Sequence, residues 1–302
     1  MYILIERTIF VNQMVILTAV RITAVRIEII ILLDMEPIFN KIQNQKADFI
    51  RKNKYAKFSN LRSSQIQDLA VVWCYYSGKI EGNTYTYVET EALLKDGITS
   101  PKRYSDAKML KNLYNTFISC AEQINKDGQI DINSFTVNSI HSMLTDELVP
   151  THNRGLLRTE PVAITGTSYI PPKDPDSIKD AFDNILANQE VISNPLERAV
   201  YLHCNLARLQ PFIDGNKRTS RVLESIVLMN ADIIPVYSSK DEDLINYRTG
   251  LIHFYETQDY TQYADYFLNR QITRINDMSP SNATTFDLVN NRVIEHDCGM
   301  EL

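Results

Sequence analysis

Apolar residues recur three and four positions apart through most of the chain after residue 34, and this spacing is the strongest constraint on the fold. The pattern covers 61–80, 104–124, 134–148, 178–192, 196–209, 218–230 and 241–270, joined by short polar links. Such spacing places apolar side chains on one face of an α-helix, which must pack against other helices to leave water. We therefore predict an all-α, mainly helical bundle. With 302 residues, 44% of them hydrophobic, the chain can form one large core or two smaller ones.

One segment, EPVAITGTSYIPP at 160–172, departs from the helical pattern. Val162 and Ile164 alternate with small or polar residues, Gly166 stands at an expected turn, and two prolines end the run. The alternation predicts an isolated β-hairpin that projects from the helical body. Because two strands alone are marginal in water, such a hairpin favours pairing with another protein. A hairpin folded onto the core is the alternative.

Residues 1–34 differ from the rest of the chain. They are rich in Ile and Val, but the apolar runs are interrupted well before the roughly 20 residues of a membrane helix, by Glu6, Arg7, Arg21, Arg26 and Glu28. The charges are not confined to the start and no small-residue cleavage site follows, which argues against a signal peptide. We interpret this atypical leader either as an added strand or as upstream sequence that is not translated, with Met35 as the start, and we favour the second.

Charge and cysteine content argue against several classes of protein. The net charge is -6 and no long run of Lys and Arg occurs, which disfavours nonspecific binding to nucleic acid or to an anionic membrane. The four cysteines are widely scattered, which fits reduced thiols better than disulfides or a zinc site. We therefore predict a cytoplasmic protein with no nucleic-acid and no membrane partner.

A short charged loop separates two of the predicted helices, in the stretch LARLQPFIDGNKRTSR at 206–221. Pro211 breaks the first helix, and the residues FIDGN that follow favour a turn. We expect the next helix to begin at Lys217, with Asn216 or Asp214 as its N-cap. The loop would then present free backbone N–H groups at a helix N-terminus, where partial positive charge attracts a phosphate.

Two arginines and an aspartate extend this anion site. Arg218 and Arg221 are three residues apart and share one helical face, where both guanidinium groups can reach the same anion. Asp214 in so cationic a loop is explained by a role as a ligand of Mg²⁺ that bridges phosphate oxygens. The stretch lacks the G-x-x-x-x-G-K-[ST] pattern of a P-loop. A capped helix whose arginines pair with carboxylates elsewhere is the alternative.

The same stretch, from Gln210 onward, resembles the active-site motif of the Fic (Fido-fold) family, whose usual form is H-P-F-x-[DE]-G-N-[GK]-R-x-x-R. Residues 160–172 stand where that family has a flap that docks the target, and NRGLLR at 153–158 resembles the segment just before it. The resemblance runs from about residue 36 to residue 270. It implies a Fido-fold helical bundle that binds ATP and transfers a nucleotide monophosphate, usually AMP, to a Ser, Thr or Tyr hydroxyl of a target protein.

The resemblance also implies roles for single residues. Asp214 would hold Mg²⁺, and Arg218 and Arg221 would grip the β- and γ-phosphates of ATP. The rest of the nucleotide site would be formed by Gly215, Asn216, Lys217 and Tyr247, the last by stacking near adenine. The target protein would dock on the flap through Val162, Ile164, Gly166 and Tyr169.

A second motif, SGKIEGN at 77–83, resembles the inhibitory [ST]-x-x-x-E-[GN] helix of the Fic class that carries its inhibitor at the N-terminal side. Independently of the resemblance, Gly82 is part of a helix stop that places Glu81 in the last helical turn. A carboxylate there faces the negative end of the helix dipole unless a cation compensates, and Arg221 is the candidate. By analogy Ser77, Glu81 and Gly82 would form an inhibitory element that withdraws Arg221 from the γ-phosphate. An exposed glutamate without consequence is the alternative.

Two positions depart from the usual motif. Gln210 stands where the family has the histidine that deprotonates the incoming hydroxyl, and an amide has no titratable proton acceptor near neutral pH. Losing such a base typically lowers the rate by a factor of about 10² to 10⁴. Lys217 replaces a glycine, as in the Doc branch of the family, which transfers phosphate, and a long cation there would crowd the α-phosphate.

Three functional hypotheses follow from these motifs. The first is a self-inhibited adenylyltransferase scaffold that Gln210 weakens or inactivates, and the second is a noncatalytic nucleotide- or protein-binding module. The third is a different phosphoryl reaction, such as Doc-like phosphoryl transfer or hydrolysis with Glu81 orienting water. We divide the chain into a leader at 1–34, an N-terminal helical region with the inhibitory helix at 35–100, a Fic domain at 101–275 and a tail at 276–302. The target protein is unknown, and monomer and homodimer are both open.

Overall fold

The structure, a computed structural model, describes residues 37–238, 240–280 and 283–295. The atypical leader at 1–34 and the expected start at Met35 lie outside these described residues, and so does Cys298. The other three cysteines are free thiols in the interior of the protein: Cys74, Cys120 and Cys204.

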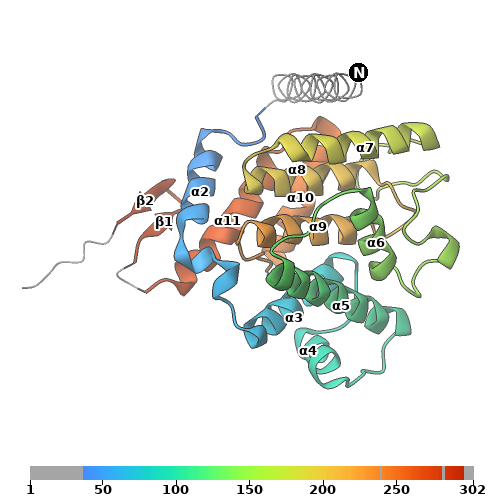
Figure 1. The fold of residues 1–302 in the computed structure, drawn as a ribbon, viewed down its shortest axis with the longest axis horizontal. Helices are drawn as coiled ribbons and strands as arrows, with labels where there is room; N and C mark the ends of the chain where they lie inside the picture. Colours follow the sequence, from blue (N-terminus) through green and yellow to red (C-terminus); the bar gives the residue numbers. More distant parts are fainter. Residues whose placement is uncertain (1–36, 239, 281–282, 296–302) are drawn as a thin grey trace, which may run out of the picture.

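The described residues form a mainly helical body, which confirms the predicted fold class (Figure 1). Its α-helices are α2 (Lys41–Lys52), α3 (Ser63–Ile80), α4 (Tyr87–Asp96), α5 (Tyr104–Asp127), α6 (Ser134–Leu144), α7 (Pro175–Val191), α8 (Pro195–Leu209), α9 (Asn216–Asn230), α10 (Asp241–Thr257) and α11 (Thr261–Met278). Short 3-10 turns occur at η1 (Lys54–Ala56), η2 (Phe58–Asn60) and η3 (Thr151–Asn153). Within the described part of the chain, none of the helices combines the length and the apolar character needed to cross a bilayer.

Helix α9 lies in the middle of this body, beside α8 and in contact with α5 and α6 (Figure 1). Every residue from Asn216 to Met229 is buried except Lys217. A helix covered on all faces keeps polar side chains only where they find partners, so the positions of its arginines are closely defined. The charged loop therefore leads directly into an enclosed helix.

Most predicted helices are found within a few residues of their expected ends, but 241–270 is two helices. Gln258 takes a left-handed backbone conformation (φ 62°) that ends α10, and the Asp259 carboxylate accepts from the backbone N–H that begins α11. Helix α2 was not among the predicted segments, because it buries Gln43 and Lys46 on its inner face and its apolar spacing is weak. Helix α4 was not predicted either.

The β-hairpin predicted at 160–172 does not form, and this prediction was wrong. The segment is irregular, with a turn at Gly166 (φ 87°) and no strand pairing along its fully described length. Its three prolines supply no N–H for a ladder, and the carbonyls at its two ends accept from the Arg158 guanidinium at 2.8 and 2.7 Å. At the tip, the Thr167 hydroxyl donates to Glu256 Oε1 of α10 at 3.0 Å, so the segment folds onto the helical body.

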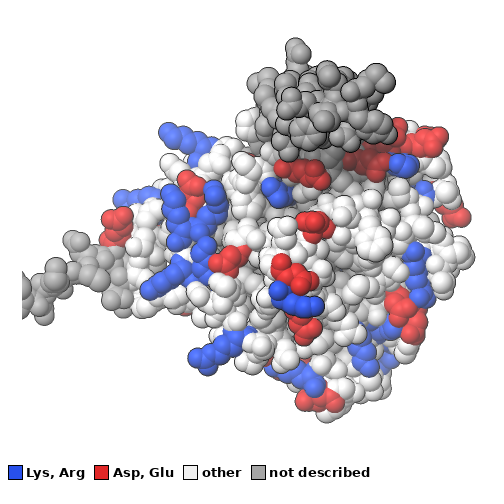
Figure 2. Space-filling model, viewed as in Figure 1, with Lys and Arg blue, Asp and Glu red and all other residues white. Residues whose placement is uncertain are grey.

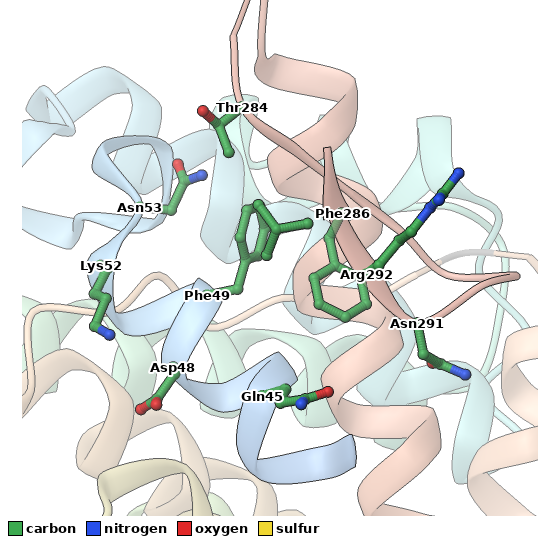
Figure 3. Close-up of a pocket in the computed structure, with 10 residues that line it drawn as sticks. Gln45, Asp48, Phe49, Lys52, Asn53, Thr284, Phe286, Asn291 and Arg292 are labelled. Carbon is green, nitrogen blue, oxygen red and sulfur yellow. The ribbon is translucent and has the colours of Figure 1, made fainter. Parts of the chain in front are cut away.

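An antiparallel strand pair lies instead in the described part of the tail, formed by β1 (Thr285–Asp287) and β2 (Arg292–Ile294). Phe286 of β1 is buried, and its ring centroid lies 5.4 Å from that of Phe49 in α2. A cavity of about 640 Å³ is lined by α2 and the strand pair (Figure 3). The sequence analysis missed the pair because three-residue strands are too short to show an alternating pattern.

Charged side chains of both signs are spread over the face of the molecule shown in Figure 2. Basic side chains gather near α2, whose last turn carries Arg51 and Lys52. The net negative charge of the chain thus coexists with a local basic cluster on this face.

Candidate active site

The charged loop joins the end of α8 to the start of α9. Gln210 ends α8 in a left-handed conformation (φ 51°), and Gly215 precedes α9 in the same region (φ 80°). Glycine also avoids a steric clash there, because a Cβ at this position would lie 2.8 Å from Thr145 Cγ2. The N-cap Gly215 has no side chain to accept from the first N–H groups of α9, which also have no intrahelical acceptor, so these groups can bind an anion.

Neither Asn216 nor Asp214 is the N-cap of α9, which corrects the sequence prediction. The Asn216 side chain turns back across the loop, where Oδ1 accepts from the Phe212 N–H at 2.8 Å and Nδ2 donates to the Phe212 carbonyl at 2.8 Å. Nδ2 also donates to Gln210 Oε1 at 2.9 Å. The Asn216 amide therefore shapes the loop and is not available to cap the helix.

The two motif arginines have different surroundings. The Arg218 Nη2 donates to Asp214 Oδ2 at 2.8 Å, and its Nη1 donates to the Leu144 carbonyl at 3.4 Å. The Arg218 side chain is 3% exposed, whereas that of Asp214 is 63% exposed. The Arg221 side chain is fully buried and pairs with Glu81. Each guanidinium group thus has one carboxylate partner.

Arg221 of α9 is enclosed by side chains of α3 and α10. Its Nη2 donates to Glu81 Oε1 at 2.7 Å, and its Nε donates to Ser77 Oγ at 3.1 Å. Its Nη1 donates to the Tyr247 hydroxyl at 3.1 Å. Glu81 is the C-cap of α3, and Gly82 follows in a left-handed conformation (φ 76°). Burial raises the pKa of Glu81, but the attraction of the neighbouring cations, Arg221 foremost, brings it below its usual value.

Lys217 places a second cation beside Glu81. Its Nζ lies 3.8 Å from Glu81 Oε2, and its side chain is 36% exposed. The sequence analysis related this lysine to the α-phosphate only, because no local pattern connects residues so far apart in the chain. Glu81 therefore lies between two positive charges of α9, and this arrangement ties the end of α3 to the start of α9.

Both polar atoms of the Gln210 side-chain amide are hydrogen-bonded within the protein. Its Nε2 donates to the Ala207 carbonyl at 2.6 Å, and its Oε1 accepts from Asn216. These bonds hold the loop, and neither end of the amide takes up a proton near neutral pH. Gln210 thus has a structural role in the loop and cannot serve as a general base.

Comparison with known proteins identifies this arrangement. Residues 131–228, which contain the whole loop and most of α9, match the model of the Fic/DOC family. The chain is a Fic family protein. It is 27% identical over 201 residues to the protein adenylyltransferase Fic of Nematostella vectensis, a match that covers 63% of this chain and 41% of the relative. The chain spans about two fifths of the length of the curated relatives it matches.

Solved structures of Fic proteins share the fold. Fic-1 from C. elegans aligns with a TM-score of 0.62 at 21% sequence identity, over 78% of this chain and 70% of that one. A Fic family protein from Desulfovibrio desulfuricans aligns with a TM-score of 0.66 at 18% identity, over 82% of this chain and 80% of that one. These similarities establish the Fic fold for most of the chain.

His141 of α6 supports the Fic loop, a role for which the local sequence gives no signal. Its ring stacks on that of Phe212, with centroids 3.8 Å apart and planes 8° apart. Nδ1 accepts from the Gly155 N–H at 2.9 Å, so the ring proton lies on Nε2, which donates to the Asp214 carbonyl at 2.9 Å. Burial lowers the pKa of His141 to about 4, which keeps this neutral form at pH 7.

Arg158 connects the flap of this Fic protein to its loop. The Arg158 Nε donates to the Gln210 carbonyl at 2.6 Å, and Nη2 donates to the Pro172 carbonyl at 2.7 Å. The backbone N–H of Arg158 donates to the Pro211 carbonyl at 2.9 Å. Arg158 ends the segment NRGLLR that marked the resemblance, but its residue type alone did not show that its partners are carbonyls.

Tyr247 cannot stack on adenine, and the role expected for it was wrong. Only 1% of the residue is exposed, whereas stacking requires an accessible ring face. Its hydroxyl lies 3.1 Å from Arg221 Nη1 and 3.0 Å from His203 Nε2. Tyr247 is therefore a partner of Arg221 in the core of the Fic domain.

The predicted docking residues lie along the irregular flap. Val162, Ile164 and Tyr169 are partly buried, and Gly166 is exposed at the tip. The Arg208 guanidinium carbon lies 3.9 Å from the centroid of the Tyr169 ring, which attaches the flap to the last turn of α8.

A magnesium ion at the Fic loop would depend on Asp214. Among the described residues, no three His, Cys, Asp or Glu side chains are grouped so that they could hold a metal ion. The Asp214 carboxylate is largely exposed near the uncapped end of α9, with one oxygen on Arg218. Because Mg²⁺ usually takes one or two carboxylates and completes its shell with phosphate oxygens and water, this donor fits Mg²⁺ bound together with a nucleotide.

Proposed function

We propose that this Fic protein binds ATP with Mg²⁺ and is organised to transfer AMP to a Ser, Thr or Tyr hydroxyl of a target protein. In this proposal Glu81 inhibits the protein, and Gln210 weakens or abolishes its chemistry. Membership of the Fic family and relatives named protein adenylyltransferases support the general activity. The inhibition and the weakened chemistry rest on the contacts of these two residues.

The observation that carries the proposal is the environment of Arg221. A fully buried guanidinium near an uncapped helix N-terminus is a preformed receptor for an anion, and the anion it holds is a carboxylate from α3. We infer that the Glu81 carboxylate occupies the place of a terminal phosphate oxygen of ATP. Glu81 and the nucleotide then compete for the same arginine.

The proposed reaction places the triphosphate along the start of α9, with its β- and γ-phosphates on Arg218 and Arg221. Mg²⁺, held through Asp214, would neutralise charge on the phosphate oxygens. The target hydroxyl oxygen forms a bond to the α-phosphorus, and the bond from that phosphorus to the β-phosphate oxygen breaks, so pyrophosphate leaves. The hydroxyl proton must pass to a base.

At position 210 that proton finds no acceptor, because the Gln210 amide is not basic and is already hydrogen-bonded. We expect the transfer rate to be lower by a factor of about 10² to 10⁴ than with a histidine at this position. Lys217 adds positive charge near the start of α9, and a Doc-like transfer of the γ-phosphate is therefore the second candidate function.

We further propose that the target protein docks on the flap, where the exposed Ile170 offers an apolar contact beside the predicted docking residues. The protein would act in the cytoplasm, with 35–100 as a regulatory region, 101–275 as the Fic domain and 276–302 as a tail. A homodimer is compatible with this arrangement.

The test is the transfer of label from ATP to the protein itself and to lysate proteins. We expect little label from the α-phosphate with the natural protein and detectable label with Gln210→His combined with Glu81→Gly. Lys217→Gly is added as a third change, to remove the cation expected near the α-phosphate. Parallel reactions with label at the γ-phosphate distinguish Doc-like transfer.

Calorimetric titration of ATP with and without Mg²⁺ accompanies these assays. Strong α-phosphate labelling by the natural protein would show that the base lies elsewhere. A triple variant that binds ATP but transfers nothing would favour a noncatalytic nucleotide-binding module. Absence of ATP binding in every folded variant would overturn the proposal.

A further inference from the structure

A chain of buried polar groups leads from Arg221 into the core, on the side away from Glu81. The Arg221 Nη1 donates to the Tyr247 hydroxyl at 3.1 Å, and this hydroxyl lies 3.0 Å from His203 Nε2. The His203 Nδ1 lies 2.7 Å from Glu224 Oε2. All four residues are at most 2% exposed, so water does not compete for these groups.

The two ends of the chain determine which group donates at each step. Arginine can only donate, and a carboxylate can only accept. Burial lowers the pKa of His203 and raises the pKa of Tyr247, so both are neutral near pH 7. His203 then carries its proton on Nδ1, facing Glu224, and its Nε2 accepts from Tyr247. The Tyr247 oxygen accepts from Arg221, and His203 Nδ1 is in close contact with the Glu224 carboxylate at 2.7 Å.

Glu224, at the inner end of the chain, has further donors. The Tyr237 hydroxyl donates to Oε1 at 2.8 Å, and the Tyr263 hydroxyl donates to Oε2 at 2.7 Å. These tyrosines come from outside α9, whereas Glu224 lies on α9 three residues after Arg221. The carboxylate is therefore held in place by several elements of the fold.

We propose that Tyr247, His203 and Glu224 are positioning residues that keep Arg221 aimed at the anion site when Glu81 is withdrawn. The contacts of Arg221 divide into a set at the end of α3, made by the buried Ser77 and the partly exposed Glu81, and a buried set that begins at Tyr247. The Glu81 carboxylate must leave before a phosphate can bind. The chain of Tyr247, His203 and Glu224 does not compete with the phosphate, and it preserves the orientation of the guanidinium after the Glu81 carboxylate has left.

A purely structural role would also make these residues important for stability, so the test must observe Arg221 itself. Tyr255 offers a matched control on α10, because it is 2% exposed and its hydroxyl has no hydrogen-bond partner in the part of the chain that the structure describes. Tyr247→Phe and Tyr255→Phe each remove one buried hydroxyl, but only the first interrupts the chain of buried polar groups that begins at Arg221.

The direct measurement is side-chain ¹⁵N NMR of the Arg221 guanidinium in the Glu81→Gly protein, with the signals assigned through Arg221→Lys. We expect restricted rotation, seen as separate Nη signals, and we expect these to merge or broaden when Tyr247→Phe is added. Adding Tyr255→Phe should leave them unchanged. Unchanged Arg221 signals in the Tyr247→Phe protein would overturn the inference.

Two histidine variants keep the test decisive where Tyr247→Phe does not fold. His203→Gln retains an acceptor and a donor and should preserve the separate Arg221 signals, whereas His203→Leu should lose them. Equal signals in both histidine variants would contradict the positioning role.

The effect on ATP rests on the proposed function. In the Glu81→Gly background, Tyr247→Phe should weaken ATP binding about tenfold, the typical effect of one hydrogen bond to a charged group, and Tyr255→Phe should change it less than twofold. If no variant binds ATP, the proposed function fails. The NMR result would still decide whether Tyr247, His203 and Glu224 position Arg221.

Discussion

Replacing Glu81 by Gln should make the protein less stable and at the same time a better binder of ATP. The change keeps the side-chain shape but removes the charge that pairs with Arg221 at 2.7 Å and lies 3.8 Å from Lys217. Breaking a buried ion pair costs about 3 to 5 kcal/mol. Because Arg221 keeps Ser77 and Tyr247 as partners, and Gln can still accept one hydrogen bond, we expect a loss of about 2 to 3 kcal/mol in the free energy of unfolding.

The free energy that Glu81→Gln loses in folding stability should be gained in the free energy of ATP binding. The pair with Glu81 must break before a phosphate reaches Arg221, so a variant without it binds ATP more tightly by up to the same 2 to 3 kcal/mol, or about 30- to 150-fold. Urea denaturation measures the first quantity, and calorimetric titration with ATP and Mg²⁺ measures the second. Loss of stability together with a gain in affinity is the signature of a self-inhibitory contact.

Glu89→Gln is the matched control. Glu89 of α4 pairs at 2.5 Å with Lys102, which lies between α4 and α5. Both side chains are more exposed than those of the Glu81–Arg221 pair, and Gln keeps the capping hydrogen bond at this position. We expect a smaller loss of stability than for Glu81→Gln and no change in ATP affinity. An ATP affinity of Glu81→Gln within twofold of the natural protein, despite the loss of stability, would refute the inhibitory role.

The lowered pKa of Glu81 adds a pH signature to this prediction. A carboxyl group whose folded pKa lies below its unfolded value of 4.5 contributes its full stability above that value. The contribution is lost as the pH falls through the folded pKa. The stability difference between the natural protein and Glu81→Gln should therefore shrink in acid.

Two further predictions concern the support of the loop. Gly215→Ala should cost about 1 to 3 kcal/mol more in urea denaturation than Gly166→Ala, because both positions have positive φ but only the first Cβ meets a fixed neighbour, Thr145 Cγ2 at 2.8 Å; equal costs would contradict this packing. His141 has an unfolded pKa of 6.5 and a folded pKa of about 4, so the unfolded state binds the extra proton between these values and stability falls as the pH is lowered. The natural protein should lose about 2 kcal/mol more than His141→Phe between pH 6.5 and 4.5, and parallel pH profiles would disprove the assignment.

The fold class and the position of the loop could be predicted because both depend on neighbouring residues. Spacing of three and four residues defines a helix wherever it occurs, and the run from Pro211 to Gly215 ends one helix and starts the next through backbone preferences alone. The helix stop at Gly82 likewise placed Glu81 at the end of α3. These features are local, so they hold before any tertiary contact forms.

Predictions from local sequence preference failed where side chains distant in the sequence form hydrogen bonds with the backbone. The flap residues alternate like a strand, but Arg158 takes the carbonyls at both ends of the segment and the prolines offer no donors. The strand pair formed instead at Thr285–Asp287 and Arg292–Ile294, where Phe286 is buried against α2 and short strands gain a core contact. Burial, and not alternation, decided which segment pairs.

The amino-acid sequence by itself determined most of the helices, the position of the charged loop and the carboxylate at the end of α3. The structure confirms the predicted pairing of Arg221 with Glu81, but only the tertiary structure decided the bond from Arg221 to Tyr247, the burial of Tyr247, the contact between Lys217 and Glu81 and the support of the loop by His141. Helical periodicity states which face of a helix is inside, but not which side chain of another helix it meets there. That choice depends on how the whole core packs, because each buried polar group must find its partner in the folded chain.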